Sequence, residues 1–465
     1  MTVKVDHLTK FNWQPQPATQ RVVDSLVDDA LRRCPHAADL ACRMKDETGT
    51  RFKDWVDHVR VPGTPENRAK IMEVGFTSRP VDGEPNNFVC DLGIFPAIIL
   101  DPAAKTTTVA IKVDSVSDFL AVHNLSKSAI HGEPFSQLRF ATAFEGAPGD
   151  AGASMMVIER HGWRGHTPLP SNPAKQAASI KHLEALCRRE RFNPTDAAGF
   201  AEINRLVDAS IADLGRDWTC DVFFEAERRY WMRRNRAAQV QYARQNKLGL
   251  GWANHDHHTY RCSRHTFTAL VTLWEKLGFH CREAFYAGAE AGWGAQVLEA
   301  PVTGITTFND VDMSPEELLG DFSHKGFTER RDTLGTVGLW CALHGEALLQ
   351  AGMHHLECQF DWHALVEQLE KSANVKTMAP FTTFPYLRQA FTEGERWTID
   401  PKRIDAILAD GSITREQADL FRASGALGSH MENLERNDGF KGFNQQGVSD
   451  IIARTDPRRV AALGR

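Results

Sequence analysis

The sequence predicts an α+β fold in which βαβββ modules repeat along the chain, with a block of helices inserted between them. Alternating apolar and polar residues, typical of strands, precede amphipathic helical segments in three units, near residues 106–163, 257–310 and 353–440. The helices of the second and third units share one apolar spacing, i, i+3, i+4 and i+7: Phe267, Leu270, Val271 and Trp274 in one, and Trp362, Leu365, Val366 and Leu369 in the other. Repetition at this scale indicates a repeated supersecondary unit.

We predict three parts of the chain. Residues 1–165 contain mixed helix and loop up to about residue 85, and then the first βαβββ unit, whose leading strand has no histidine at its head. Residues 166–250 form a helical connecting block, because apolar residues recur there at three- and four-residue steps. Residues 251–465 hold the second and third units, and a helical stretch at 401–425 interrupts the third.

The composition is that of a globular protein, which we expect to be cytoplasmic. The 465 residues carry a net charge of −6, which argues against general polyanion binding. Nine cysteines without a CxxC pair are typical of reduced thiols rather than of disulfides or a cysteine zinc site. We recognise no signal-peptide pattern and no apolar run near the roughly 18 residues of a membrane span. The basic, aromatic segment 228–236 is interpreted as a charged helix face, so we expect no nucleic-acid or membrane partner.

Histidines cluster at the head of the second unit, in "GWANHDHHTYRCS". Side chains alternate between the two faces of a strand, so His257, Thr259 and Arg261 share one face and His258 lies on the other. The polar face is expected to line a cleft and the apolar face to pack against helices. This alternation selects His257 as a candidate metal ligand.

The head of the third unit, "MHHLECQFD", repeats the histidine pair. Here His355, Glu357 and Gln359 share the polar face, whereas His354 lies on the apolar one. We therefore predict His355 as the second ligand and expect His354 to pack. Histidines at equivalent positions of two repeats favour a metal site over two unrelated structural histidines.

Two histidines and one carboxylate form the facial triad that leaves open positions on Fe(II) for substrate and oxygen. The last strand offers Glu432 and Glu435, which are three residues apart and face opposite ways, so only one can be the ligand. Glu299, in "AQVLEAP", is a further candidate, at the end of what we interpret as the final strand of the second unit.

These strand heads resemble the vicinal oxygen chelate superfamily, whose proteins pair βαβββ modules into open mixed β-barrels. "HHTYR" resembles "HGAIR" of the 2-oxoadipate dioxygenase/decarboxylase (hydroxyglutarate synthase) family, and "GSHMENLER" resembles its "GSHTARFGEIEQR". "ENLERNDGFKGFN" also resembles the closing segment of 4-hydroxyphenylpyruvate dioxygenases. The resemblance implies that His257, His355 and Glu432 hold iron and that Arg261 binds a substrate carboxylate.

The resemblance implies a non-haem Fe(II)-dependent dioxygenase that decarboxylates and hydroxylates a 2-oxo acid, with a small-molecule carboxylate and O2 as its partners. Zinc, manganese or nickel is the alternative metal. One alternative function is an extradiol-type ring-cleaving dioxygenase. Another is a redox-neutral glyoxalase-type isomerase or lyase with four ligands, His257, Glu299, His355 and Glu432. A metal-free binding protein of this fold is the remaining class. The sequence does not identify the substrate, and it leaves open whether the protein forms a homo-oligomer.

Overall fold

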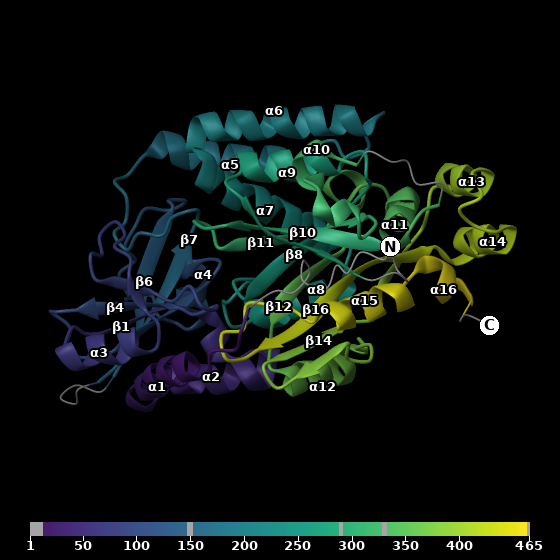
Figure 1. The fold of residues 1–465 in the computed structure, drawn as a ribbon. Helices are drawn as coiled ribbons and strands as arrows, with labels where there is room; N and C mark the ends of the chain where they lie inside the picture. The colour runs from purple at the N-terminus through teal and green to yellow at the C-terminus, as the bar shows by residue number, and fades with distance from the viewer. Residues whose placement is uncertain (1–12, 147–151, 288–291, 328–332, 463–465) are drawn as a thin grey trace.

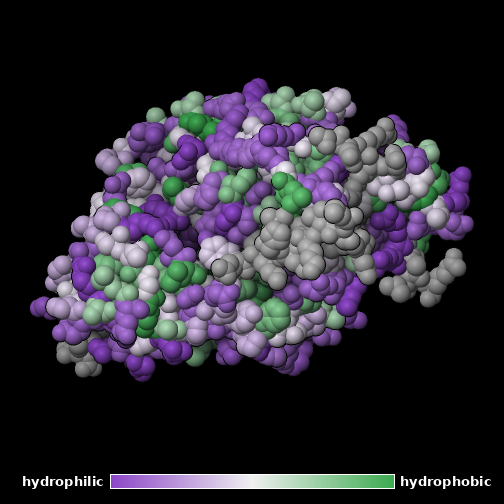
Figure 2. Space-filling view, viewed as in Figure 1, coloured by the Kyte–Doolittle hydropathy of each residue, from purple (hydrophilic) through white to green (hydrophobic). Residues whose placement is uncertain are grey.

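The computed structural model describes residues 13–146, 152–287, 292–327 and 333–462. Two mixed β-sheets lie side by side, one formed by the N-terminal part of the chain and the other by the C-terminal part, and helices cover their outer faces (Figure 1). The face of the molecule seen in Figure 2 is mainly hydrophilic, with small scattered hydrophobic patches. Among the described residues, no helix is both long and apolar enough to cross a bilayer.

The N-terminal sheet has the strand order β2-β3-β4-β1-β5-β7-β6. Its strands are β1 (Val56–Pro62), β2 (Thr77–Ser78), β3 (Asn87–Val89), β4 (Ala97–Asp101), β5 (Thr108–Lys112), β6 (Leu138–Glu145) and β7 (Ser154–Arg160). Its helices and turns are α1 (Pro17–Arg33), α2 (Pro35–Thr48), η1 (Phe52–Trp55), α3 (Pro65–Glu73) and α4 (Val116–Val122). One core joins this sheet to α1, α2 and α4.

This sheet corrects two details of the sequence interpretation. The unit near residues 106–163 is a shorter βαββ unit, β5-α4-β6-β7, with β5 parallel to β7. A complete βαβββ module precedes it, β1-α3-β2-β3-β4, with β1 parallel to β4, in a region expected to be helix and loop up to about residue 85. Strands β2 and β3 span only two and three residues, too few to show an alternating pattern.

The helical block consists of four helices: α5 (Pro173–Cys187), α6 (Asp196–Leu214), α7 (Arg216–Arg233) and α8 (Arg236–Asn246). Helix α6 lies along the top of the molecule in Figure 1, and α5 and α7 lie below it. Buried residues of α6, α7 and α8 join the core of the C-terminal sheet. The boundaries of the three predicted parts, 1–165, 166–250 and 251–465, stay predictions.

The C-terminal sheet has the order β13-β14-β16-β12-β8-β11-β10-β9, and β15 pairs with β16. Its strands are β8 (His255–Cys262), β9 (His280–Tyr286), β10 (Trp293–Ala300), β11 (Ile305–Asp312), β12 (His355–Gln359), β13 (Thr382–Phe384), β14 (Leu387–Phe391), β15 (Glu395–Trp397) and β16 (Ala426–Arg436). The remaining helical segments are α9 (Phe267–Lys276), η2 (Glu317–Leu319), α10 (Phe322–Lys325), α11 (Thr336–His344), the π-helical turn η3 (Ala347–Ala351), α12 (Trp362–Ala373), α13 (Pro401–Ala409), α14 (Arg415–Ser424), α15 (Gln445–Arg454) and α16 (Pro457–Ala462).

Two complete βαβββ modules make this sheet, and the α+β class with repeated modules is confirmed. In the first, β8-α9-β9-β10-β11, the outer strands β8 and β11 run parallel. In the second, β12-α12-β13-β14-β16, the strands β12 and β16 run parallel, and β15, α13 and α14 are inserted before β16. The modules join through their first strands, because β8 and β12 are antiparallel neighbours. Both sheets are open rather than closed barrels.

Candidate metal centre

The register of three central strands brings the candidate ligands together. Across the antiparallel β8/β12 pair, His257 lies opposite Glu357 and Thr259 lies opposite His355. Across the parallel β12/β16 pair, Glu357 lies beside Glu432. These residues share one face of the sheet, because positions two apart on a strand point the same way. The strands are interior to the sheet, so hydrogen bonds on both sides fix the backbone that carries each side chain.

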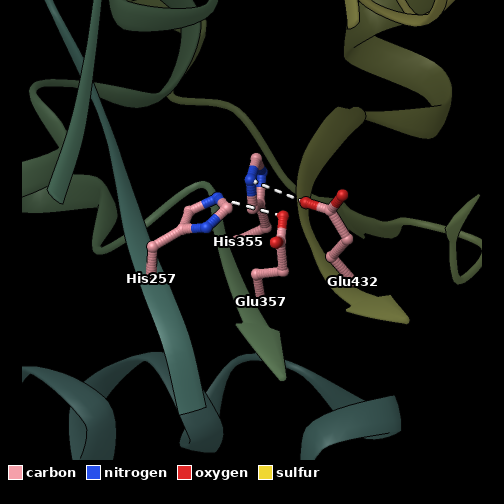
Figure 3. Close-up of side chains that lie close together, drawn as sticks. All are labelled: His257, His355, Glu357 and Glu432. Atoms are coloured by element: carbon pink, nitrogen blue, oxygen red, sulfur yellow. Dashed lines mark ion pairs between the residues drawn. The ribbon is translucent and has the colours of Figure 1, made fainter. Parts of the chain in front are cut away.

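Two histidines and two glutamates form a compact buried group. Their ligand atoms all lie within 4.8 Å of one another. Figure 3 shows the four side chains converging from β8, β12 and β16. His257 Nε2 is 3.0 Å from Glu357 Oε2, and His355 Nε2 is 3.1 Å from Glu432 Oε2. Each imidazole therefore already directs its Nε2 atom toward a carboxylate.

Surrounding polar groups hold these side chains in place. Asp256 Oδ1 lies 3.1 Å from His257 Nδ1, and Arg436 donates to both oxygens of Asp256 at 3.0 and 3.1 Å. A carboxylate on the far nitrogen fixes the orientation and tautomer of a metal-binding histidine and leaves Nε2 free for the metal. Gln389 Nε2 donates to Glu432 Oε1 at 3.2 Å and lies 3.4 Å from Glu357 Oε2.

The electrostatics of the group favour a cation. Burial and the facing Glu357 raise the pKa of Glu432 well above its usual value. Burial would lower the pKa of His257, but the carboxylates of Glu357 and Asp256 outweigh it and raise that pKa to about 9. Burial and the nearby His257 lower the pKa of His355 well below its usual value. Two buried carboxylates that face each other need a proton or a metal between them, and a divalent ion satisfies both without a proton.

The structure places the histidines as the strand alternation predicted. His257 and His355 lie in the group, whereas His258 points the other way and packs edge-on against Phe224 at 5.0 Å between ring centroids. The Nδ1 atom of His354 lies 3.0 Å from the Gly428 carbonyl oxygen. Metal ligation by His257 and His355 itself stays a prediction.

Of the two glutamates offered by the last strand, Glu432 lies in the group. Glu435 faces the opposite side of β16, where its Oε2 accepts a hydrogen bond from the Trp362 backbone N–H at 2.9 Å. Its other oxygen lies 3.8 Å from Arg51 Nη1 and 3.5 Å from Arg388 Nη1. Glu435 therefore orders the start of α12 and lies outside the group.

The placement of Glu299 differs from the expectation. Glu299 lies near the end of β10, which is the third strand of its module, because β11 follows as the fourth. It forms ion pairs with Lys441 at 2.9 Å and Arg282 at 3.3 Å and is not a member of the group. The β11 residue beside the site is Phe308, whose ring centroid is 4.2 Å from that of His257. The four-ligand set that includes Glu299 is thus not assembled.

Glu357 is the residue of the group that the sequence interpretation did not select. The alternation puts it on the polar face of its strand, two residues after His355, but the carboxylate candidates were Glu432, Glu435 and Glu299. Glu357 is only 1% exposed, and the groups that face its carboxylate are His257 at 3.0 Å, Gln389 at 3.4 Å and Arg436 at 3.5 Å. The His-x-Glu spacing on a single strand is the signal that could have found it.

Arg261 lies further along the face of β8 that carries His257, beside Asp310 of β11 in the register. It is only 2% exposed, and within the part of the chain that the structure describes its Nε and Nη2 groups have no hydrogen-bond partner. Burial raises the pKa of Asp310 to about 7, against the opposing effect of Arg261. Unpaired donors on a buried guanidinium are costly, and an anionic ligand would satisfy them.

A small cavity of about 30 Å³ adjoins the group. Its apolar wall is mostly aromatic and comes from β9, β11, β14 and the C-terminal segment, with side chains including Phe285, Phe308, Phe391 and Phe443. This volume suits an ion and a solvent molecule. A larger ligand requires these rings to move, and Arg261 is not part of the lining.

The chain matches no protein-family model and no curated protein. Among solved structures it is similar to a putative glyoxalase superfamily protein from Ralstonia eutropha, with 12% identity, a TM-score of 0.32, and coverage of 59% of this chain and 100% of the other. It is similar to a mutant of 4-hydroxymandelate synthase from Streptomyces coelicolor, with 11% identity, a TM-score of 0.25, and coverage of 88% and 98%. It is also similar to methylmalonyl-CoA epimerase from Mycobacterium tuberculosis, with 13% identity, a TM-score of 0.22, and coverage of 40% and 88%. The module arrangement is established by the strand order of this chain itself.

Proposed function

We propose that the protein is a non-haem Fe(II)-dependent dioxygenase that decarboxylates and hydroxylates a 2-oxo acid, and that His257, His355 and Glu432 hold the metal. The observation that carries the proposal is the convergence of two imidazoles and a carboxylate from three adjacent strands in a buried site. This donor set leaves open positions on Fe(II). Zinc, manganese and nickel suit the same donors and are the alternatives.

The proposed substrate is a 2-oxo dicarboxylic acid of the 2-oxoadipate type. Arg261 supports this choice, because its unpaired Nε–H and Nη2–H groups would donate two hydrogen bonds to a carboxylate. It lies four residues beyond His257, which is about 13 Å along the strand at about 3.3 Å per residue. The reacting 2-oxo acid end would lie at the metal and the second carboxylate at Arg261. An aryl pyruvate would place its ring against the aromatic wall instead.

Bound Fe(II) would supply the chelation of the 2-oxo acid and the activation of oxygen, and the side chains would supply geometry. Asp256 would hold His257 by its Nδ1 atom, with Arg436 holding Asp256 in turn. Gln389 would orient the carboxylate of Glu432. The aromatic wall would exclude water from the site, which strengthens every charge interaction within it.

Oxygen consumption by anaerobically iron-loaded protein tests this function. The panel contains 2-oxoadipate, 4-hydroxyphenylpyruvate and catechols, and CO2 release is followed in parallel. We expect one CO2 for each O2 with a 2-oxo acid, no uptake by His257→Ala, and retained uptake by the matched control His258→Ala. Uptake with a catechol and no CO2 would indicate ring cleavage instead.

A redox-neutral isomerase or lyase is the second candidate, and Glu357 favours it. A four-ligand site needs a second carboxylate, and the structure supplies Glu357 in place of the expected Glu299. Such a site would act as a Lewis acid on a carbonyl group. Tightly bound zinc or nickel, together with no oxygen uptake on the whole panel, would select this function over the dioxygenase.

A further inference from the structure

A large cleft between the two sheets adjoins the metal cavity. It has a volume of about 530 Å³ and is lined by residues of both sheets. Phe308 belongs to the linings of both the cleft and the small cavity. Its ring packs against His257 at 4.2 Å and against Phe443 at 5.3 Å between centroids. Phe308 is thus the wall that separates the cleft from the metal centre.

The lining of the cleft is positively charged, although the whole chain carries a net charge of −6. Eight of its lining residues are Lys or Arg and five are Asp or Glu. Each of the five carboxylates already has a cationic partner within 3.1 Å: Asp54 with Arg51, Asp57 with Arg160, Asp91 with Arg79, Asp256 with Arg436, and Glu299 with Lys441. Some of the Lys and Arg side chains that line the cleft are therefore not paired with these carboxylates and can bind an anion from solution.

Lys112 is the clearest of these cations. It is the last residue of β5, and among the described residues its ammonium has no hydrogen-bond or ion-pair partner. Burial lowers its pKa, against the opposing effect of the nearby Asp57 and Asp221 carboxylates, and a bound anion would oppose the effect of burial in the same way. Arg164 also lines the cleft, and it donates a hydrogen bond to the Val302 carbonyl oxygen at 3.3 Å.

We infer that an anionic substrate reaches the metal centre through this cleft, with Lys112 attracting it and Phe308 closing the inner end. The inference rests on the proposed metal centre and on an anionic substrate. A positively lined cleft raises the local concentration of anions and speeds their association, by about 10-fold or more where steering is strong. The cleft is much larger than the metal cavity, so it can hold the whole substrate before Phe308 moves.

Metal removal by two chelators of similar size tests the route without any turnover. The protein is loaded with Co(II), and its spectrum reports metal loss to dianionic pyridine-2,6-dicarboxylate or to neutral 1,10-phenanthroline. We expect Lys112→Met to slow removal by the dianion about fivefold at low ionic strength, and Lys112→Arg to restore the rate. The neutral chelator should remove the metal equally fast from the wild type and from Lys112→Met. For the dianion, about 0.5 M salt should erase the difference in rate between these two proteins.

Lys105→Met is the matched charge control, because Lys105 is exposed on the loop before β5 and outside the cleft lining. Phe308→Ala should speed removal by both chelators severalfold. Unchanged dianion rates in Lys112→Met, or chelator rates insensitive to Phe308→Ala, would overturn the inference.

These outcomes are separable from those of the oxygen assay. Protein that holds Co(II) but oxidises no 2-oxo acid still reports on the route through its chelator rates. If the protein holds no metal, the proposed function fails. Calorimetric titration of the metal-free protein with pyridine-2,6-dicarboxylate then measures the affinity of the cleft for an anion directly. Binding that Lys112→Met weakens severalfold would retain the cleft as an anion site, and the absence of binding would overturn it.

Discussion

Replacing each site glutamate by glutamine separates a metal ligand from a neighbouring charge. Glu432→Gln removes the carboxylate 3.1 Å from His355 Nε2, and Glu357→Gln removes the one 3.0 Å from His257 Nε2. Glutamine keeps the size of the side chain and loses its charge. If the centre has three ligands, Glu432→Gln removes an anionic ligand. Glu357→Gln then removes only a nearby group that orients the ligands and balances charge.

The expected magnitudes differ accordingly. Loss of a group that orients metal ligands typically weakens metal binding by about 10–100-fold, so Glu357→Gln should fall in that range and Glu432→Gln should exceed it. Metal that binds only the folded state at about 100 times its Kd adds about 2.7 kcal/mol of stability. At the same metal concentration, a variant with about 100-fold weaker binding gains only about 0.4 kcal/mol.

In the metal-free protein, we expect the repulsion between the two glutamates to lower the free energy of unfolding. Burial and Glu357 raise the pKa of Glu432, so the two carboxylates destabilise each other when no cation is present. Glu432→Gln relieves this repulsion, and we expect the metal-free variant to be at least as stable as the wild type. Glu357→Gln relieves it too but also removes the carboxylate that pairs with His257 at 3.0 Å, so we expect it to be the less stable of the two metal-free variants. A loss of stability in metal-free Glu432→Gln would show that this glutamate holds the fold together rather than prepares a metal site.

Urea unfolding with and without Mn(II), together with calorimetric metal titration, measures both effects. The three-ligand reasoning is refuted if Glu357→Gln loses the metal as completely as Glu432→Gln does, since Glu357 would then be a ligand. Unchanged metal affinity in Glu432→Gln would remove Glu432 from the centre altogether.

Three further outcomes follow from the same geometry. Elemental analysis of purified protein should find the metal in His258→Ala and His354→Ala and no metal in His257→Ala. The reverse pattern would contradict the strand register. Burial raises the pKa of Asp310 to about 7, so the folded state keeps a proton that the unfolded chain loses above about pH 4. Stability should therefore fall by up to about 4 kcal/mol as the pH rises from about 4 to 7, and urea unfolding of Asp310→Asn should not show this fall; an unchanged pH dependence in Asp310→Asn would count against a protonated Asp310. Arg261→Met should raise KM for 2-oxoadipate about tenfold or more, because a hydrogen bond to a charged group contributes about 1.5–3 kcal/mol; an equal effect on a monocarboxylic 2-oxo acid would mean that Arg261 does not hold the second carboxylate.

The side chains that meet at the site could be predicted because strand alternation is a local property. His257 and His355 were selected over their neighbours from the pattern alone, and the pairing of β8 with β12 brings both into one group. Glu357 was not selected, although it shares the face of His355, because the carboxylate candidates were sought on the last strand and at Glu299. A fully buried second carboxylate becomes visible only when the neighbouring strands are in place.

Features that depend on strand order could not be predicted in the same way. Glu299 was given a possible ligand position because β11 was not recognised as the fourth strand, and its ion pairs come from the C-terminal segment and β9. The N-terminal module was missed because its β2 and β3 are so short. The cleft requires two sheets to lie side by side, which no local pattern specifies.

Anomalous diffraction from crystals of metal-loaded protein tests the central claim most directly. We predict one metal peak within coordination distance, about 2.0–2.3 Å, of His257 Nε2, His355 Nε2 and a Glu432 oxygen. A peak elsewhere, for example among Asp196, His265 and Glu346, which form a separate group outside this face of the sheet, would contradict the account. So would fully loaded crystals with no peak between β8, β12 and β16.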